Sequence, residues 1–197
     1  MSDFFGKDFN IMGNDFEELR MTLHNKEYDP SIALRIAKLL TDDKYQFSVS
    51  IDDNDIVYFR IKHASSDRLY IRHKVKRNTI SISMVLDYDP NIIEQKRNDL
   101  LYACNYNDIN TSYVKTTLLS DCIHFYYRMP PGTEECIEKV LREVLYDLMV
   151  NCDIEMIDSV VKSNIDIEKY CKNKDEEFHK MIKASIENYK SREIKVD

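Results

Sequence analysis

The sequence predicts an α+β domain in which helices pack on one face of an antiparallel β-sheet. Apolar and polar residues alternate through the middle of the chain, from Tyr45 to Leu86, with the period of half-buried strands. The connections between these strands are too short for parallel crossovers, so the strands are expected to form a meander. On both sides of the meander, apolar residues recur at three- and four-residue steps, which predicts helices. With 197 residues and three glycines, the chain suggests one globular domain with extensions.

Four strands are expected in the meander, over residues 45–51, 55–63, 69–76 and 79–86. Polar segments separate them and supply the residue types that favour tight turns. Period-two alternation assigns each strand residue to the core side or to the outer side of the sheet. The residues expected on the core side of the second and third strands are apolar, with His73 as a polar exception: Val57, Phe59, Ile61, Leu69, Ile71 and Val75.

Two Asp-Pro pairs are expected to begin helices. Asp is a favourable N-cap, and Pro lacks the amide hydrogen that the first helical turn leaves unpaired. The first pair, Asp29–Pro30, precedes an apolar stripe, and the second, Asp89–Pro90, precedes a helix that ends near Asn105. A shorter helix is expected over residues 14–24.

The second half of the chain is expected to add a hairpin and two long helices. A polar turn over 105–110 leads into strands at 113–119 and 122–129. Thr133 is expected to cap the next helix, whose pattern either continues or kinks near Asn151, and Asn164 is expected to cap the last one. One side of that last helix is apolar: Ile167, Tyr170, Cys171, Phe178, Met181, Ile182 and Tyr189.

The meander is also the basic part of an acidic chain. Residues 56–78 contain seven Arg and Lys and one acid, whereas the whole chain has a formal net charge of −7. A solvated face that discourages edge pairing explains this pattern. A docking surface for an acidic protein partner also explains it, and so does nucleic-acid binding, which the net charge disfavours. The candidate partner-binding residues lie on the outer side: Tyr58, Arg60, Lys62, Tyr70, Arg72, Lys74 and Lys76.

No motif that is diagnostic of a particular catalytic mechanism is evident in the sequence. It has no Gly-rich phosphate loop, no His-Glu-x-x-His helix and no nucleophile elbow, so no catalytic residue, cofactor or metal is expected. His63 and His73 could become neighbours on adjacent strands, but two histidines without another ligand make a poor metal site. The five scattered cysteines are expected to be reduced and mostly buried. No apolar run is long enough to span a membrane and no signal peptide is evident, which predicts a cytoplasmic protein.

The order of elements resembles that of the YbjN family. The acidic turn over 52–55 and the segment Asn105 to Lys115, which resembles that family's Asn-rich helix end followed by a strand with a Lys, carry the resemblance over residues 29–161. The chain differs in lacking glycine in the acidic turn and in its additional last helix. The resemblance implies a fold like that of type III secretion chaperones, and a bacterial, non-enzymatic, protein-binding role with dimer formation.

The expected organisation is an N-terminal extension over 1–28, a YbjN-like α+β domain over 29–163 and a C-terminal helical extension over 164–197. The expected function is a chaperone-like or regulatory module that binds a protein partner. The alternatives are a small enzyme whose site is assembled from distant residues and a weak nucleic-acid binder. A homodimer is also expected, because the apolar stripes of the last two helices exceed what one small sheet can cover.

Overall fold

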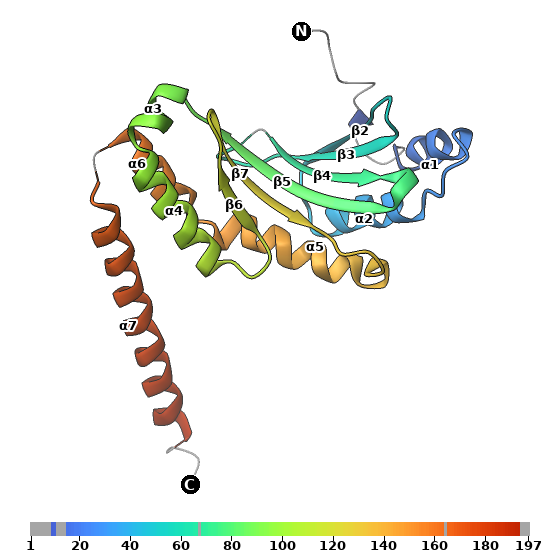
Figure 1. The fold of residues 1–197 in the computed structure, drawn as a ribbon. Helices are drawn as coiled ribbons and strands as arrows, with labels where there is room; N and C mark the ends of the chain where they lie inside the picture. The colour runs from blue at the N-terminus through green and yellow to red at the C-terminus, as the bar shows by residue number, and fades with distance from the viewer. Residues whose placement is uncertain (1–8, 11–14, 67, 164, 194–197) are drawn as a thin grey trace.

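The computed structural model describes residues 9–10, 15–66, 68–163 and 165–193. Its α+β architecture, with helices beneath one antiparallel sheet, confirms the predicted fold class (Figure 1). The predicted cap Asn164 lies outside the described residues, as does most of the segment before Asp15.

The sheet has the strand order β1-β2-β3-β4-β5-β7-β6, with every neighbouring pair antiparallel. The first turn of the meander is built by Asp52, whose carboxylate accepts hydrogen bonds from the backbone amides of Asn54 and Ile56 at 3.0 and 2.8 Å. The predicted third strand ends at Lys74 rather than at residue 76, because residues Val75–Arg77 turn through a 3-10 helix. The strands are β1 (Phe9–Asn10), β2 (Phe47–Ile51), β3 (Ile56–Ile61), β4 (Leu69–Lys74), β5 (Thr79–Asp87), β6 (Lys115–Leu118) and β7 (Cys122–Arg128).

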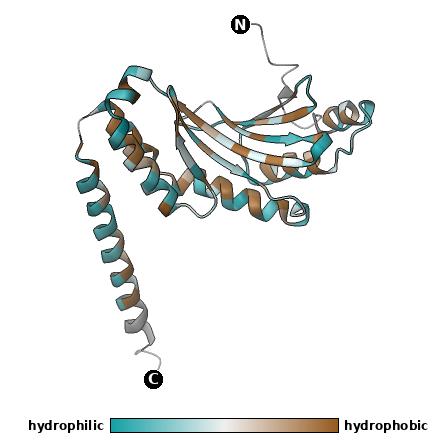
Figure 2. Ribbon diagram, viewed as in Figure 1, coloured by the Kyte–Doolittle hydropathy of each residue, from teal (hydrophilic) through white to brown (hydrophobic). Residues whose placement is uncertain are grey.

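One layer of helices covers the apolar face of the sheet. Helices α2 (Ser31–Asp42) and α5 (Ile137–Tyr146) run beneath the strands, with α1 (Asp15–Asn25) beside α2 (Figure 1). Figure 2 shows apolar residues alternating with polar ones along the strands and the helices. The core lies between the two layers because strand and helix each have one apolar side. Phe59, Phe125 and Ile36 are among its fully buried side chains.

Both Asp-Pro pairs begin helices, as predicted. The carboxylate of Asp29 accepts a hydrogen bond from the amide of Ser31 at 2.9 Å, and that of Asp89 accepts one from the amide of Asn91 at 2.8 Å. The predicted helix after Asp89 is in fact two helices, α3 (Pro90–Gln95) and α4 (Arg97–Asn110), separated at Lys96.

The prediction of a polar turn over residues 105–110 is wrong, because this segment forms the last turns of α4. Its polar side chains bind backbone instead of solvent. Asn107, which is fully buried, accepts a hydrogen bond from the amide of Asp153 at 2.7 Å. Asp108 accepts one from the amide of Thr116 at 2.6 Å. Asparagine and aspartate have low helix propensity, so composition suggested a turn, but these tertiary contacts stabilise the helix.

The helix after the hairpin begins differently from the prediction. Thr133 does not cap it, because the Thr133 hydroxyl donates to the carbonyl of Pro130 at 2.6 Å. A 3-10 turn (Glu134–Cys136) precedes α5, and a π-helical turn (Asp147–Asn151) follows it. Of the two alternatives that the sequence left open, the break near Asn151 is the one found, since α6 (Ile154–Lys162) begins anew after it.

Asp147 in the π-helical turn anchors the hairpin to the helix layer. Its side chain is buried, and its carboxylate accepts hydrogen bonds from the amides of Ser112 and Tyr113 at 3.0 and 2.8 Å. The side-chain amide of Asn151 donates to the same carboxylate at 2.7 Å. Three donors therefore satisfy a carboxylate that burial would otherwise destabilise.

The last helix, α7 (Ile167–Glu193), packs on the domain only through its first turns. Ile167 and Cys171 are buried, and Asp175 accepts a hydrogen bond from the Tyr106 hydroxyl at 2.9 Å. Beyond these contacts the helix extends away from the body (Figure 1). The apolar stripe continues there, with Phe178, Met181, Ile182 and Ile186 between 42% and 69% exposed.

The end of α2 is made without a glycine. Lys44 follows the helix with φ of 61°, the left-handed conformation that usually favours glycine at this position. The amide of Lys44 donates to the carbonyl of Thr41 at 3.0 Å, and that of Tyr45 donates to the carbonyl of Leu40 at 2.9 Å. These two bonds close the helix end and hold the strained residue in place.

Candidate functional site

The strand register divides the sheet into a covered face and an open face. Paired residues in an antiparallel sheet point to the same side. Val49, Phe59 and Ile71 are paired across β2, β3 and β4, and all three are buried against the helices. The next residues along the strands, among them Arg60 and Tyr70, therefore point to the other side, which none of the described helices covers in Figure 1.

Five of the seven predicted binding residues lie on strands of this open face. Arg60 is paired with Tyr70, Tyr58 is paired with Arg72, and Lys74 ends β4. The rings of Tyr58 and Tyr70 meet edge to face, with centroids 6.3 Å apart. Tyrosine rings and guanidinium groups are thus brought together as the alternation predicted.

The other two predicted residues lie at the ends of strands. Lys62 follows β3 and is exposed. Lys76 lies in the 3-10 turn, where its ammonium forms an ion pair with Asp55 at 2.8 Å. Lys26 and the hydroxyl of Tyr28 bind the same carboxylate at 2.9 and 2.8 Å, and this cluster holds the pKa of Asp55 well below its usual value, chiefly through Lys76. We therefore assign Lys76 to a structural cluster at the end of the sheet rather than to the open face.

Two side chains of the open face are held in position by neighbours. The Arg72 guanidinium donates from Nη2 to the Ser83 hydroxyl at 2.7 Å. The Tyr58 hydroxyl donates to Asp52 Oδ2 at 3.2 Å, and its pKa is raised by partial burial and by that carboxylate. Such bonds fix the side chains before any ligand arrives, which reduces the entropy lost on binding.

Sequence reasoning missed the part of the open face that β7 and β6 contribute. Tyr126 is paired with Ser83 and with Lys115, and Arg128 is paired with Ser81. Tyr126 is 41% exposed, and Arg128 and Lys115 are exposed as well. Alternation put Tyr126 and Arg128 on one side of their strand, opposite Ile123 and Phe125, but it could not show that this strand pairs with β5, because that pairing depends on tertiary contacts.

The open face is cationic. His124, which also lies on it, adds no charge near neutral pH, because partial burial and then Arg72 and Arg68 lower its pKa. The single acid, Asp87, is paired with Arg68 at 2.5 Å. Among the strand residues that the structure describes on this face, five are basic against that one acid: Arg60, Arg72, Lys74, Lys115 and Arg128.

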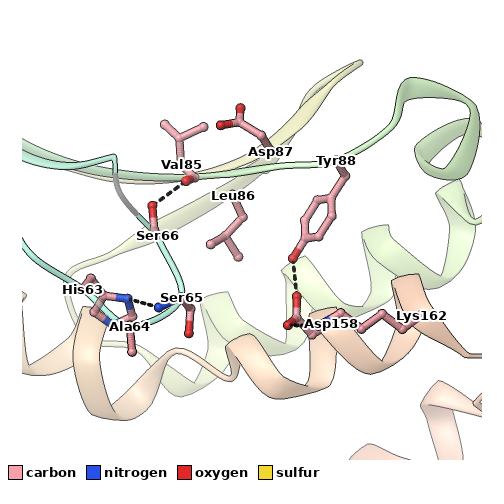
Figure 3. A pocket seen from close by; sticks show the side chains of 10 residues that line it. All are labelled: His63, Ala64, Ser65, Ser66, Val85, Leu86, Asp87, Tyr88, Asp158 and Lys162. Atoms are coloured by element: carbon pink, nitrogen blue, oxygen red, sulfur yellow. Dashed lines mark hydrogen bonds and ion pairs between the residues drawn. The ribbon is translucent and has the colours of Figure 1, made fainter.

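A cavity of about 500 Å³ lies at one end of the sheet, between the loop after β3, the end of β5 and α6 (Figure 3). Its polar groups are largely bound to one another. The Tyr88 hydroxyl donates to Asp158 at 2.8 Å, and the Ser66 hydroxyl donates to the carbonyl of Val85 at 2.7 Å. Partial burial and the Asp158 bond raise the pKa of Tyr88.

Two further groups of the cavity are also bonded to neighbouring residues. His63 Nδ1 accepts the amide of Ser65 at 3.1 Å, and burial lowers the pKa of this imidazole. Lys162 is paired with Asp158 at 2.6 Å. The bond of Tyr88, which directly follows β5, joins the end of that strand to Asp158 of α6, and Lys162 of the same helix neutralises this carboxylate.

His63 and His73, which could have become neighbours on adjacent strands, lie far apart in the fold. His63 lines the cavity, whereas His73 is buried on the covered face beside Val57 and Ile80. Across the described part of the chain, no group of three His, Cys, Asp or Glu side chains could hold a metal ion. Four cysteines are buried and Cys136 is exposed, all as free thiols.

The chain matches no protein-family model, no curated protein and no solved structure. The resemblance to the YbjN family therefore stays a prediction. No helix among the described residues has the length and apolar character required to cross a membrane.

Proposed function

We propose that this protein is a non-enzymatic binding module whose open sheet face takes an acidic segment of a protein partner. The observation that carries the proposal is that the described strand residues of this face include five bases and one acid, within a chain of net charge −7. Opposite charge steers such a partner to the sheet and away from the acidic remainder of the molecule.

A protein segment fits this face better than nucleic acid does. Tyr58 is packed edge to face with Tyr70 and is bonded to Asp52, so both contacts would have to change before a base could stack on it. The dense charge of a phosphate backbone would also be repelled by the acidic remainder of the chain more strongly than a peptide with scattered carboxylates. Serine hydroxyls on β2 and β5, by contrast, suit the amides of a polypeptide.

Charge reversal on the face tests the proposal. The probe is a fluorescent polyglutamate peptide of about 20 residues, titrated by anisotropy at about 50 mM salt, where surface charges are weakly screened. We expect the double variant Arg72→Glu, Lys74→Glu to bind about tenfold or more weakly than the unmodified protein. The matched control, Lys38→Glu with Lys139→Glu, makes the same change of net charge on exposed residues of α2 and α5 and should keep its affinity.

Three outcomes overturn this proposal. The first is no binding of polyglutamate by the unmodified protein, and the second is an equal loss in the double variant and in its control. The third is tighter binding of a single-stranded thymidine oligonucleotide of about the same length, which would assign the face to nucleic acid instead.

We also propose that the protein forms a homodimer through the distal half of α7. Its exposed apolar stripe has no partner among the described residues, and a two-fold axis would place the stripe of one copy against the same stripe of the other. The helix has seven Lys and Arg against six Asp and Glu, so two copies repel little there although the whole chain is acidic. The free thiols fit a reducing compartment, and we propose the cytosol.

A further inference from the structure

We propose that the two α7 helices of the homodimer run antiparallel, so that the distal half of each one packs against the body of the other copy. The surface that receives it is an apolar patch made by Tyr113, Tyr146 and Val150. This inference rests on the proposed homodimer and deepens it, because it names the orientation of the helices and a second contact surface. The partner that fits the patch is a second copy of this chain.

The exposed stripe of α7 is broader than the contact between two helices. Met181 and Ile186 form its two flanks, and they lie about 140° apart around the helix axis, because each residue turns an α-helix by about 100°. The seam between the helices of a coiled coil is narrower than this. One neighbouring helix therefore covers the centre of the stripe, at Phe178 and Ile182, and leaves a flank open to a further surface.

The area of the stripe leads to the same conclusion. Its four side chains are between 42% and 69% exposed, and they offer about 400 Å² in each copy, since a large side chain has about 150–250 Å² of surface. Two stripes together would bury about 800 Å², whereas specific, stable interfaces bury about 1,200–2,000 Å². A dimer held by the stripes alone falls short of that range.

The body offers the missing area in the apolar patch. The Asp147 carboxylate accepts a hydrogen bond from the amide of Tyr113 at 2.8 Å, and Tyr146 directly precedes this aspartate. Val150 follows Tyr146 by about one helical turn, on the same side. The three side chains of the patch are 39%, 55% and 60% exposed. They add about 300 Å² in each copy and raise the total for the dimer to about 1,400 Å².

The ion pair between Lys174 and Asp153 places the patch beside the first turns of α7. Asp153 is only three residues after Val150 in the chain. Met181 lies about two turns beyond Lys174 on the same side of the helix, so this flank of the stripe is on the side of the patch. The distal half extends away from its own body in Figure 1, and the patch of its own copy stays exposed.

Only antiparallel helices bring the distal half of one α7 to the patch of the other copy. Phe178 and Ile186 are about 12 Å apart along the helix, at about 1.5 Å per residue. In a parallel pair, Ile186 of one copy lies beside Ile186 of the other, at the end that points away from the body. In an antiparallel pair centred on Ile182, it lies beside Phe178, one turn from Lys174 and therefore close to the patch.

The charges of α7 also favour the antiparallel arrangement. Residues 178–193 carry four Lys and Arg against two Glu, whereas residues 167–177 carry three Lys against four Asp and Glu. The chain has a net charge of −7 and α7 contributes +1, so the remainder of the molecule carries −8. Antiparallel helices place the basic segment beside an acidic segment and an acidic body, whereas parallel helices place two basic segments together.

Removal of the patch tests the inference on the full-length protein. The variant is Tyr146→Ser with Val150→Ser. The matched control is Met21→Ser with Leu119→Ser, which removes exposed apolar side chains from α1 and from the turn between β6 and β7. We expect the patch variant to raise the dimer dissociation constant in sedimentation equilibrium about tenfold or more, because each copy loses apolar contact area. The control should leave the constant unchanged, and circular dichroism checks that each variant is folded.

A disulfide test measures the orientation of the helices, with the exposed Cys136 replaced by serine in every variant. Val150→Cys protein mixed with Ile186→Cys protein should form a covalent dimer under mild oxidation. Neither protein should do so alone, because a disulfide joins Cα atoms only about 4.4–6.8 Å apart.

The outcomes separate this inference from the proposed homodimer. If the patch variant dimerises as tightly as its control while Phe178→Ser with Ile182→Ser is monomeric, the inference fails and the dimer stands. A covalent dimer of Ile186→Cys alone, or none in the mixture, overturns the antiparallel arrangement. If the unmodified protein is monomeric, both proposals fall.

Discussion

His73 is a buried histidine that the fold keeps neutral. Its Nε2 lies 3.2 Å from the side-chain oxygen of Asn78, and its Nδ1 has no hydrogen-bond partner among the described residues. Burial lowers its pKa, against smaller opposing effects of Asn78 and Asp29. Below the usual histidine pKa of 6.5, the unfolded chain therefore takes up a proton that the folded chain refuses.

Stability should consequently fall as the pH drops from about 7.5 to about 5.5, because the unfolded state binds more protons in this range. In His73→Leu, an apolar side chain on the apolar face, we expect a smaller loss of unfolding free energy over the same range. Urea unfolding at the two pH values measures it. Asn173→Ala, an uncharged substitution at an exposed position of α7, is the control and should retain the full pH dependence. An equal dependence in His73→Leu and the unmodified protein would contradict this account.

At the scale of elements, apolar contacts rather than ion pairs are expected to hold α2 and α5 in their layer. Arg35 of α2 binds Glu138 of α5 through two bonds of 2.6 and 2.7 Å, but both side chains are more than a third exposed. Solvent screens such a pair, so Glu138→Gln should cost about 1 kcal/mol or less. Ile36→Ala, at a fully buried position, should cost about 2–5 kcal/mol. Urea midpoints at constant m-value measure the two losses of stability. A larger loss in Glu138→Gln than in Ile36→Ala would show that the ion pair, and not the apolar contacts, holds the two helices.

Elements were predictable where periodicity and caps agreed. The alternation around Phe59 and the Asp29–Pro30 and Asp89–Pro90 pairs led to correct strands and helix starts. The prediction failed at 105–110, where contacts with residues further along the chain overruled a local preference, and at Thr133, whose hydroxyl binds the nearby carbonyl of Pro130 instead. Asn107 illustrates the reason, because its side chain is bound by the amide of residue 153, and no local pattern carries that information.

At the scale of the whole molecule, α7 is expected to join two copies without supporting the fold of either. A chain that ends after Glu177 keeps the buried first turns and the bond of Tyr106 to Asp175. We expect this truncation to reduce the molar mass in light scattering from about twice 23.4 kDa to that of one chain, with little change of the melting temperature.

The point variant Phe178→Ser with Ile182→Ser should act like the truncation, whereas Lys180→Ala, away from the apolar stripe, should leave the dimer intact. A monomeric full-length protein would reject the dimer. So would a truncated protein that still has the larger mass.

At the scale of the whole sheet, the β3 and β4 part of the candidate site could be predicted from the sequence, whereas the β7 part could not. Tyr58, Arg60, Tyr70 and Arg72 are brought together by consecutive hairpins, so their common face follows from local alternation. Tyr126 joins them only because β7, which follows two intervening helices, pairs with β5. Pairing between distant strands depends on the assembled core, so local patterns in the sequence do not reveal it.

The left-handed conformation of Lys44 at the end of α2 marks a position where a substitution can raise the stability of the protein. A residue with a Cβ in that conformation costs about 1 kcal/mol, a torsional cost that glycine would relieve. The position belongs to the helix layer and not to the face that carries Arg72 and Tyr126. A substitution at Lys44 can therefore change the stability of the fold without changing a residue of the open face.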